Sequence, residues 1–480
     1  MRHKVRIEGI VTPDDALTKW LHVPFEVPPG ACRLEVNYHY ANQVQGAQEF
    51  NPGNNIDIGV FDVRGAEFLG NGFRGWSGGA RSSFYITPGA ATPGYLRGPL
   101  QPGNWTILLG LSKISDPEVP YRINVEFDLD PENPDAGAGE LPDPLPRLRD
   151  AVAGASDGGA GRWYKGDLHA HSEHSDGQNT VAEIIAYTKR AGLDYFALTD
   201  HNTISHWDDL ARINDGAPLL IPGEEITMYD GHANIWGIDA WVDFRVNEPH
   251  QVEQLIADAR RKGSMFSINH PDSPIPWEHE LVRGYQGIEV WNAPWRWYNE
   301  PALIRWQYHL NRGQRIVAVG GSDSHCVPPA KMTQPNLPGE PCTWVYVEGP
   351  LTQRSLLDAV ERGRIFISES PDGPFLELRA DADGDGVFET LPGDVIAPGF
   401  QNPVKFHIKY RGPDGKHLRF FTRKACVLDL VAEREEYDFE FEVPLDGNDY
   451  LRCEARGFRG RPERGEVVLA LTNPIYAGRW

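Results

Sequence analysis

The sequence predicts an α/β barrel of parallel strands between two β-sandwich domains, and three observations lead to this fold class. In the middle of the chain, short clusters of histidine and acidic residues each follow an apolar run, as functional groups do at the carboxyl ends of barrel strands. Both flanks contain alternating runs of strand length separated by Gly and Pro, which is typical of sandwiches. With 480 residues, the chain exceeds what one hydrophobic core usually organises.

The domain boundaries follow from changes in composition along the chain. Residues 1–129 contain runs such as CRLEVNYHY, NIDIGVFDV and NWTILLGL and predict an N-terminal β-sandwich. Residues 130–161 are rich in Pro, Gly and Asp without apolar periodicity, which predicts a linker. Residues 162–370 form the predicted barrel. Residues 371–480, with VKFHIKY, LRFFTR and YDFEFEV, predict a second β-sandwich.

The most informative motif is the HxH pair formed by His169 and His171 in DLHAHSEHSDG. Side chains at i and i+2 of an extended segment point to the same face, so the two imidazoles can share one metal ion. Hydrolytic metal sites need three or four protein ligands and an open position for water. Further candidate ligands therefore come from the ends of the later apolar runs, which carry His201, Glu225, His232, His270, Asp323 and His325.

The order of these clusters resembles a known family. The matching pieces are DLHAHSEHSDG, LTDHN, IPGEEI, GHANIWG, NHP, EVWN and GGSDSH. This series resembles the PHP (polymerase and histidinol phosphatase) superfamily of metallohydrolases, and more narrowly its branch related to carbaryl hydrolase. The resemblance covers roughly residues 160–370, and the ending ALTNPIYAGRW is similar to that branch as well. It implies a distorted (β/α)7 PHP barrel, a TIM-like barrel that holds two or three divalent metal ions.

The resemblance also implies a ligand set. The first ion would be bound by His169, His171, Glu225 and Asp323. The second would be bound by Glu225, His232 and His270, and the third by Asp176, His201 and His325. Of two neighbouring glutamates, Glu225 rather than Glu224 is the predicted ligand, because the family's ligand stands directly before Ile226. A carboxylate shared between two ions would keep them roughly 3.5–4 Å apart.

The donor types indicate the chemistry. Mixed imidazole and carboxylate ligands suit Mn²⁺, Fe²⁺ or Zn²⁺, and water bound to such ions loses a proton near neutral pH. In the resulting hypothesis, a hydroxide that bridges two ions attacks an electrophilic phosphorus or carbonyl centre. His201 or His325, where it is not fully engaged by a third ion, is the candidate catalytic general acid for the leaving group.

Three functions remain open from the sequence. The preferred one is a metal-dependent phosphoesterase that acts on small phosphate mono- or diesters. A carboxylic or carbamate ester hydrolase would use the same metal centre. The third is a non-catalytic module whose sandwiches bind glycans or proteins, and the complete set of predicted ligands argues against it.

The sequence allows two interpretations for several residues. Asp167 either orients a ligand histidine or caps a loop. The aromatic cluster after EVWN and two nearby cations, Arg296 and Lys331, either line a substrate pocket or pack against a neighbouring domain. The segment DADGDGVFE begins like a calcium loop at Asp381 but has no acidic residue at the twelfth position, so a tight β-turn is the preferred prediction.

Composition narrows the partners and the compartment. A formal net charge of −22 argues against nucleic acid and favours a small-molecule ester substrate. No run of apolar residues is long enough to cross a membrane, and the N-terminus has no apolar signal segment. The five cysteines form no CxxC pattern, and their number predicts no disulfide framework. We expect a cytoplasmic protein, with export open if a signal was removed, and leave open whether it forms a homo-oligomer.

Overall fold

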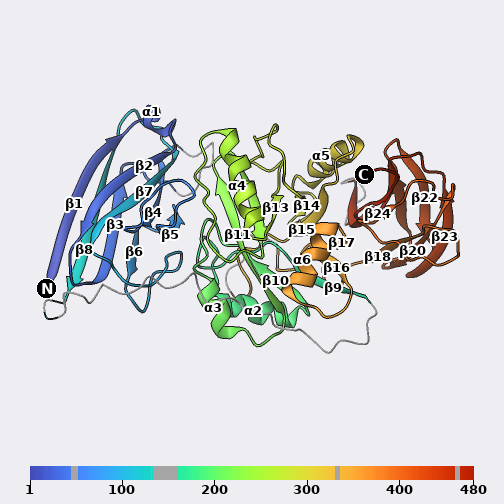
Figure 1. Ribbon diagram of the computed structural model, residues 1–480, viewed down its shortest axis with the longest axis horizontal. Helices are drawn as coiled ribbons and strands as arrows, with labels where there is room; N and C mark the ends of the chain where they lie inside the picture. Colours follow the sequence, from blue (N-terminus) through green and yellow to red (C-terminus); the bar gives the residue numbers. More distant parts are fainter. Residues whose placement is uncertain (45–51, 131, 133–160, 330–335, 460–464) are drawn as a thin grey trace.

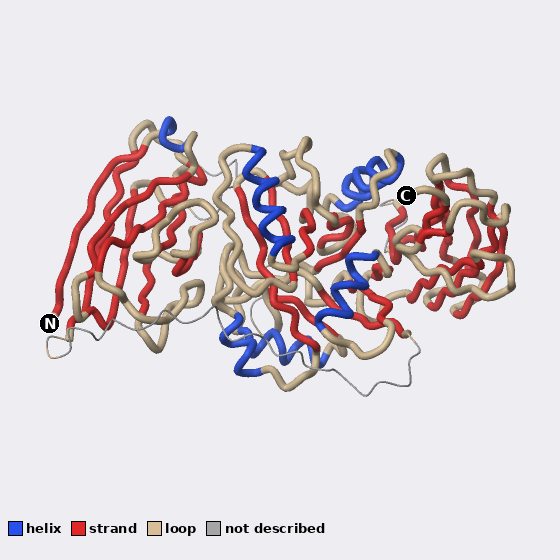
Figure 2. The backbone as a smooth tube through the Cα atoms, in the orientation of Figure 1, coloured by secondary structure: helices blue, strands red, loops and turns tan. Residues whose placement is uncertain are grey.

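The computed structural model describes residues 1–44, 52–130, 132, 161–329, 336–459 and 465–480 (Figure 1). The predicted linker 130–161 therefore lies almost entirely outside the described residues, and so does Lys331. Two β-rich flanks lie at opposite ends of a mixed α/β centre (Figure 2). Among the described residues, no helix is long and apolar enough to span a membrane.

The N-terminal flank consists of two antiparallel four-stranded sheets, in the orders β1-β8-β3-β6 and β2-β7-β4-β5. Buried and less buried positions alternate along β3, as expected for a strand with one face on a core. The flank has its own hydrophobic core, so the sheets are sandwich-like as predicted. Its elements are β1 (Arg2–Val11), α1 (Pro13–Ala16), β2 (Trp20–Val27), β3 (Ala31–Tyr40), β4 (Asn55–Phe61), β5 (Phe73–Gly78), β6 (Ser83–Ile86), β7 (Gly103–Lys113) and β8 (Val119–Leu129).

The centre combines buried strands with helices. Its strands are β9 (Arg162–Asp167), β10 (Tyr195–Leu198), β11 (Leu219–Met228), β12 (Gly231–Trp236), β13 (Met265–Ile268), β14 (Gly287–Asn292), β15 (Val317–Gly321), β16 (Cys342–Val347) and β17 (Ile365–Ser368). Its helices are α2 (Val181–Arg190), α3 (Trp207–Ile213), α4 (Pro249–Arg261), α5 (Asn299–Asn311) and α6 (Gln353–Arg362). Thr180 caps the first of these helices in a capping box with Glu183.

The central strands lie in the order β15-β14-β13-β12-β11-β10-β9-β16-β17. The strands from β9 to β11 pair in parallel, and so do those from β13 to β15. β12 is antiparallel to both neighbours, because a tight hairpin connects it to β11 without a crossover helix. Beyond β9 and β15, an isolated parallel bridge links Ala170 to Ser324. The described helices are too few for a regular (β/α)7 repeat, and that barrel stays a prediction.

The C-terminal flank continues the central sheet, because β17 pairs with β25 in antiparallel register. β24, β21 and β22 follow in the same sheet, and β18-β20-β23 form a second sheet across a separate core. The elements are β18 (Phe375–Asp381), β19 (Val395–Ile396), β20 (Val404–Arg411), β21 (Lys416–Phe421), β22 (Cys426–Ala432), β23 (Glu436–Val443), β24 (Asp449–Phe458), β25 (Glu466–Thr472) and β26 (Ile475–Ala477). The layers are again sandwich-like, whereas the predicted domain boundaries stay predictions.

Candidate metal centre

The predicted site residues come together at one end of the central strands. His169, His201 and His270 follow β9, β10 and β13, and Asp323 follows β15. Glu225 lies in β11. His232 begins rather than ends its strand, because β12 runs antiparallel and its first residues reach the same end of the sheet. Apolar strand interiors thus place polar side chains at a common edge.

Glu225 is at the middle of the group, and its side chain is completely buried. Its Oε1 lies 3.3 Å from His232 Nδ1 and 3.4 Å from His270 Nε2. Its Oε2 lies 2.7 Å from His201 Nδ1. In all, its two oxygens lie within 3.4 Å of ring nitrogens of His169, His171, His201, His232 and His270. One carboxylate therefore contacts all five of these histidines.

Glu224 has a different environment, although it is the next residue. Successive side chains of a strand point to opposite faces, and Glu224 Oε2 accepts a hydrogen bond from the backbone N–H of Val242 at 3.1 Å. Burial raises the pKa of Glu224 well above its ordinary value, which favours the neutral acid. Of the two glutamates that the sequence offered, Glu225 is the one among the histidines.

Asp323 lies beside the HxH pair. Its Oδ1 lies 3.0 Å from His171 Nε2 and 3.4 Å from His169 Nε2. The two Nε2 atoms are themselves 3.1 Å apart. If both carried protons, they would repel each other at this distance, whereas two unprotonated nitrogens beside a carboxylate match a shared cation.

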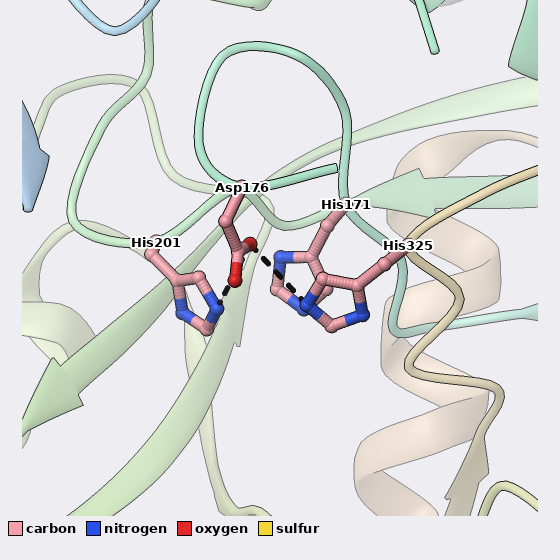
Figure 3. A group of neighbouring side chains, drawn as sticks. All are labelled: His171, Asp176, His201 and His325. Carbon is pink, nitrogen blue, oxygen red and sulfur yellow. Dashed lines mark ion pairs between the residues drawn. The ribbon is translucent and has the colours of Figure 1, made fainter. Parts of the chain in front are cut away.

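A further group of side chains, here called the third cluster, consists of His171, Asp176, His201 and His325 (Figure 3). Asp176 Oδ1 lies 3.2 Å from His325 Nε2 and 3.5 Å from His201 Nε2. One ligand atom from each of the four residues lies within 4.8 Å of the others. The sequence predicted three of these residues for a third ion, and His171 joins them.

Charges within the third cluster are strongly coupled. Burial lowers the pKa of His325, but the Asp176 carboxylate outweighs it and raises the pKa to about 10. Burial likewise lowers the pKa of His201, and Glu225 together with Asp176 raises it to about 9. Metal ions bind neutral imidazole, so a cation would displace protons from these rings.

Around the ligand candidates lies a layer of orienting groups that the sequence analysis did not identify. Glu289 Oε1 lies 2.9 Å from His169 Nδ1. Its Oε2 accepts from the backbone N–H of His270 and from the Asn292 amide, each at 3.0 Å. Asn269 donates to Glu225 Oε1 at 2.8 Å. A carboxylate within the buried run GIEVWN was the signal for Glu289, since such a group is costly without partners.

Two aspartates support the loops of the site. Asp167 accepts from the backbone N–H groups of His169, Ser322 and Gly339 at 2.7–3.1 Å. Of its two interpretations, loop capping therefore describes its contacts. Asp200, which the sequence analysis missed, accepts from the Ser172 backbone N–H at 2.7 Å. Asp200 is buried. Its position at the end of an apolar run, directly before His201, was the local sign of its role in the sequence.

The structure also shows the contacts of the aromatic cluster, of Arg296 and of the segment that begins at Asp381. Trp291 and Trp295 are buried against each other in the central core. Arg296 donates to the Gly465 carbonyl of the C-terminal flank at 3.4 Å, so this cation packs against a neighbouring region. Asp381 accepts from the backbone N–H groups of Gly384 and Gly386, in the tight turn predicted for this segment.

The donor set fits divalent cations. Among the described residues, candidate metal groups at this end combine imidazole and carboxylate atoms within 4.8 Å of one another. Within the part of the chain that the structure describes, the buried Glu225 Oε2 and His232 Nδ1 atoms have no hydrogen-bond partner, as expected for atoms that could bind an ion. Imidazole with carboxylate is the donor mixture of Mn²⁺, Fe²⁺ and Zn²⁺ sites.

Comparison with known proteins gives the class of the centre. Residues 167–300 match the family model of the PHP domain. The chain is 26% identical over 145 residues to the uncharacterized protein MJ1587 of Methanocaldococcus jannaschii. The matched region covers 27% of this chain and 82% of that protein. A crystal structure from Bacteroides vulgatus, a two-domain protein containing a predicted PHP-like metal-dependent phosphoesterase, is 18% identical with a TM-score of 0.37. The structural match covers 69% of this chain and 100% of the Bacteroides vulgatus chain. Residues 167–300 are thus similar to the PHP domain, whereas the branch related to carbaryl hydrolase stays a prediction.

Proposed function

We propose that this protein is a metal-dependent hydrolase of small phosphate mono- or diesters. One observation carries the proposal: nine imidazole and carboxylate side chains, with the buried Glu225 in their middle, converge at one end of the central strands. Residues 167–300, which match the PHP domain, supply seven of them, and the other two are Asp323 and His325. The bridge between Ala170 and Ser324 supports a closed, distorted barrel that gathers these strand ends.

The proposed ligands keep the grouping that the family resemblance implies, although by distance Glu225 also groups with His169 and His270, and with His201 and His232. His169, His171, Glu225 and Asp323 would bind one ion, and Glu225, His232 and His270 a second. The third cluster would bind a third ion. Mn²⁺, Zn²⁺ and Fe²⁺ suit these donors, and such ions when bound lower the pKa of water and neutralise negative charge on a substrate.

The chain's own residues orient the ligands and supply protons. Glu289 accepts the Nδ1 proton of His169, which leaves Nε2 free to face Glu225 and Asp323. In a protein whose third cluster holds no ion, His201 and His325 would retain protons, because Glu225 and Asp176 raise the pKa of His201 and Asp176 raises that of His325. Either ring is a proposed general acid for the oxygen of the leaving group.

A phosphate ester is favoured over a carboxylic or carbamate ester by the number of adjacent ligand groups. A phosphate carries several charged oxygens, and up to three neighbouring cations would neutralise them together. A carboxylic ester presents a single carbonyl oxygen. The complete set of ligands likewise argues against a non-catalytic binding module. The acidic chain, with a net charge of −22, favours a small molecule over nucleic acid as substrate.

The test combines metal analysis with turnover. Protein loaded with Mn²⁺ or Zn²⁺ should bind metal and hydrolyse p-nitrophenyl phosphate or bis-p-nitrophenyl phosphate faster than p-nitrophenyl acetate. Glu225→Gln should lower kcat/KM by about 100-fold or more and reduce metal content, because it removes the central charge. Glu224→Gln is the matched control, since that neighbour contacts Val242 instead and favours its neutral form. Equal losses in both variants, or a protein that binds no metal, would contradict the proposal.

A further inference from the structure

We propose that Arg81 of the N-terminal flank is a positioning residue for the third cluster. In this inference, its guanidinium holds the loop 172–177 and so determines where Asp176 lies relative to His201 and His325. The inference rests on the proposed function, because it assumes that the third cluster binds a divalent ion. It assigns to the flanking sandwich a role in building the metal centre.

The contact is direct and involves two donors. Arg81 lies between β5 and β6, and its Nη1 donates to the carbonyl oxygen of Ser175 at 3.1 Å. Its Nη2 donates to the carbonyl oxygen of Glu173. Ser175 immediately precedes Asp176 in the chain. The rigid guanidinium fork fixes two carbonyls at once, which a single flexible donor could not do.

The same loop is held from the other side by the PHP domain. Asp200 accepts from the Ser172 backbone N–H at 2.7 Å and from Ser175 Oγ at 2.6 Å. Within the loop, the Gly177 N–H donates to the Ser172 carbonyl at 3.0 Å. Arg81 completes these contacts on the face toward the sandwich. Because 49% of the Asp176 side chain is exposed, packing alone does not fix this carboxylate.

A second contact from the sandwich reaches the same loop indirectly, through Ser205. The backbone N–H of Gly94 donates to Ser205 Oγ at 3.0 Å, and this hydroxyl lies 2.7 Å from His174 Nδ1. The sandwich therefore contacts both the loop that carries Asp176 and the loop that follows His201. The first loop supplies Asp176, and the second begins directly after His201, so two of the four residues of the third cluster lie in or next to these loops.

The experiment measures how many Mn²⁺ ions the full-length protein binds and how tightly, by isothermal titration and by metal analysis at fixed free Mn²⁺. Arg81→Ala should lower the affinity for one Mn²⁺ ion by about 10- to 100-fold, the usual effect of losing an orienting contact. The affinity for the ions around Glu225 should stay unchanged. Arg81→Lys retains one donor and should give an intermediate loss. Hydrogen exchange of the amides of 172–177 should become faster in Arg81→Ala.

The matched control is Arg97→Met. Arg97 lies on the same flank and pairs at 2.9 Å with Asp208, which belongs to α3 and not to the loop 172–177. This variant should keep wild-type affinity for all ions. Unchanged affinity and exchange in Arg81→Ala would overturn the inference, and so would an equal loss in Arg97→Met.

Failure of the inference can be told apart from failure of the proposed function. A wild-type protein that binds two ions and hydrolyses esters would overturn the role of Arg81 at a third ion and leave the hydrolase standing. A protein that binds no ion at all would overturn both. Loss of every ion together in Arg81→Ala would also contradict a specific effect on Asp176.

Discussion

The two β-rich flanks contain similar alternating runs of residues, but they are joined to the centre by different kinds of contact. The C-terminal flank shares backbone hydrogen bonds with it, because β25 pairs with β17. Asn473 adds two side-chain hydrogen bonds to the backbone of Ala318, each 2.8 Å long. The N-terminal flank is joined by side chains, including Arg81, Arg97 and the pair Tyr229 and Asp57. The C-terminal flank should therefore unfold with the centre. The N-terminal flank, joined through side chains that include Trp20 and Trp76 of the central core, should respond less directly to changes in the central strands.

The largest expected effect compares a buried leucine from each flank. Leu469 belongs to the core that includes the central strands, and Leu109 belongs to the separate N-terminal core. Leu469→Ala and Leu109→Ala should each cost about 2–5 kcal/mol of local stability, through lost burial and a cavity. Hydrogen exchange in dilute urea should show that only Leu469→Ala destabilises β15. If Leu109→Ala destabilised β15 equally, the contrast between the flanks would be wrong.

An intermediate effect concerns Asp57 at the N-terminal contact. Tyr229 donates to Asp57 Oδ2 at 2.7 Å, and burial raises the pKa of Asp57 to about 6 from 3.8. The folded state binds this proton more tightly than the unfolded state, so the contribution of Asp57 to stability is greatest below pH 3.8. That contribution falls as the pH rises toward about 6 and is constant above it.

Asp57→Asn should therefore raise the free energy of unfolding at pH 8 by about 1–3 kcal/mol, since the amide still accepts from Tyr229 and carries no charge. At pH 5 the gain should be smaller. Urea unfolding at both pH values measures the difference, and the exposed Asp239→Asn serves as the control. A destabilised Asp57→Asn at pH 8 would show that the carboxylate is needed in its charged form.

The smallest effect concerns the ion pair between Arg97 and Asp208. The Arg97 side chain is 45% exposed, so water and salt screen the pair. Arg97→Met should lower the free energy of unfolding by less than about 1 kcal/mol, and this loss should be smaller still in about 1 M salt. Thermal unfolding at low and high salt measures this. A loss of several kcal/mol would mean that single ion pairs do determine the attachment of this flank.

Much of the candidate site could be predicted because its geometry is local. The HxH pair predicts two imidazoles on one face, and the Nε2 atoms of His169 and His171 lie 3.1 Å apart. Most of the remaining predicted ligands follow or begin buried strands, and Glu225 lies near the end of β11, so their common location follows from strand direction. The alternating runs of both flanks similarly predicted sandwich-like sheets.

Other features could not be predicted because they depend on partners distant in the chain. Glu289 contacts His169 across 120 positions, and Arg81 contacts Glu173 across 92. Neither contact leaves a local pattern. The antiparallel β12 was also unexpected, because a tight hairpin there replaces the crossover helix of a regular barrel.

The sequence by itself determined which residue types stand at the strand ends, and hence that imidazoles and carboxylates suited to divalent metals would gather there. It also determined the alternation that puts Glu224 and Glu225 on opposite faces of β11. Only the tertiary structure decided that Glu225 contacts the histidines, that His171 joins Asp176 in the third cluster, and that Arg81 holds their loop. Alternation along a strand follows from backbone geometry, whereas the direction in which each face points depends on long-range packing.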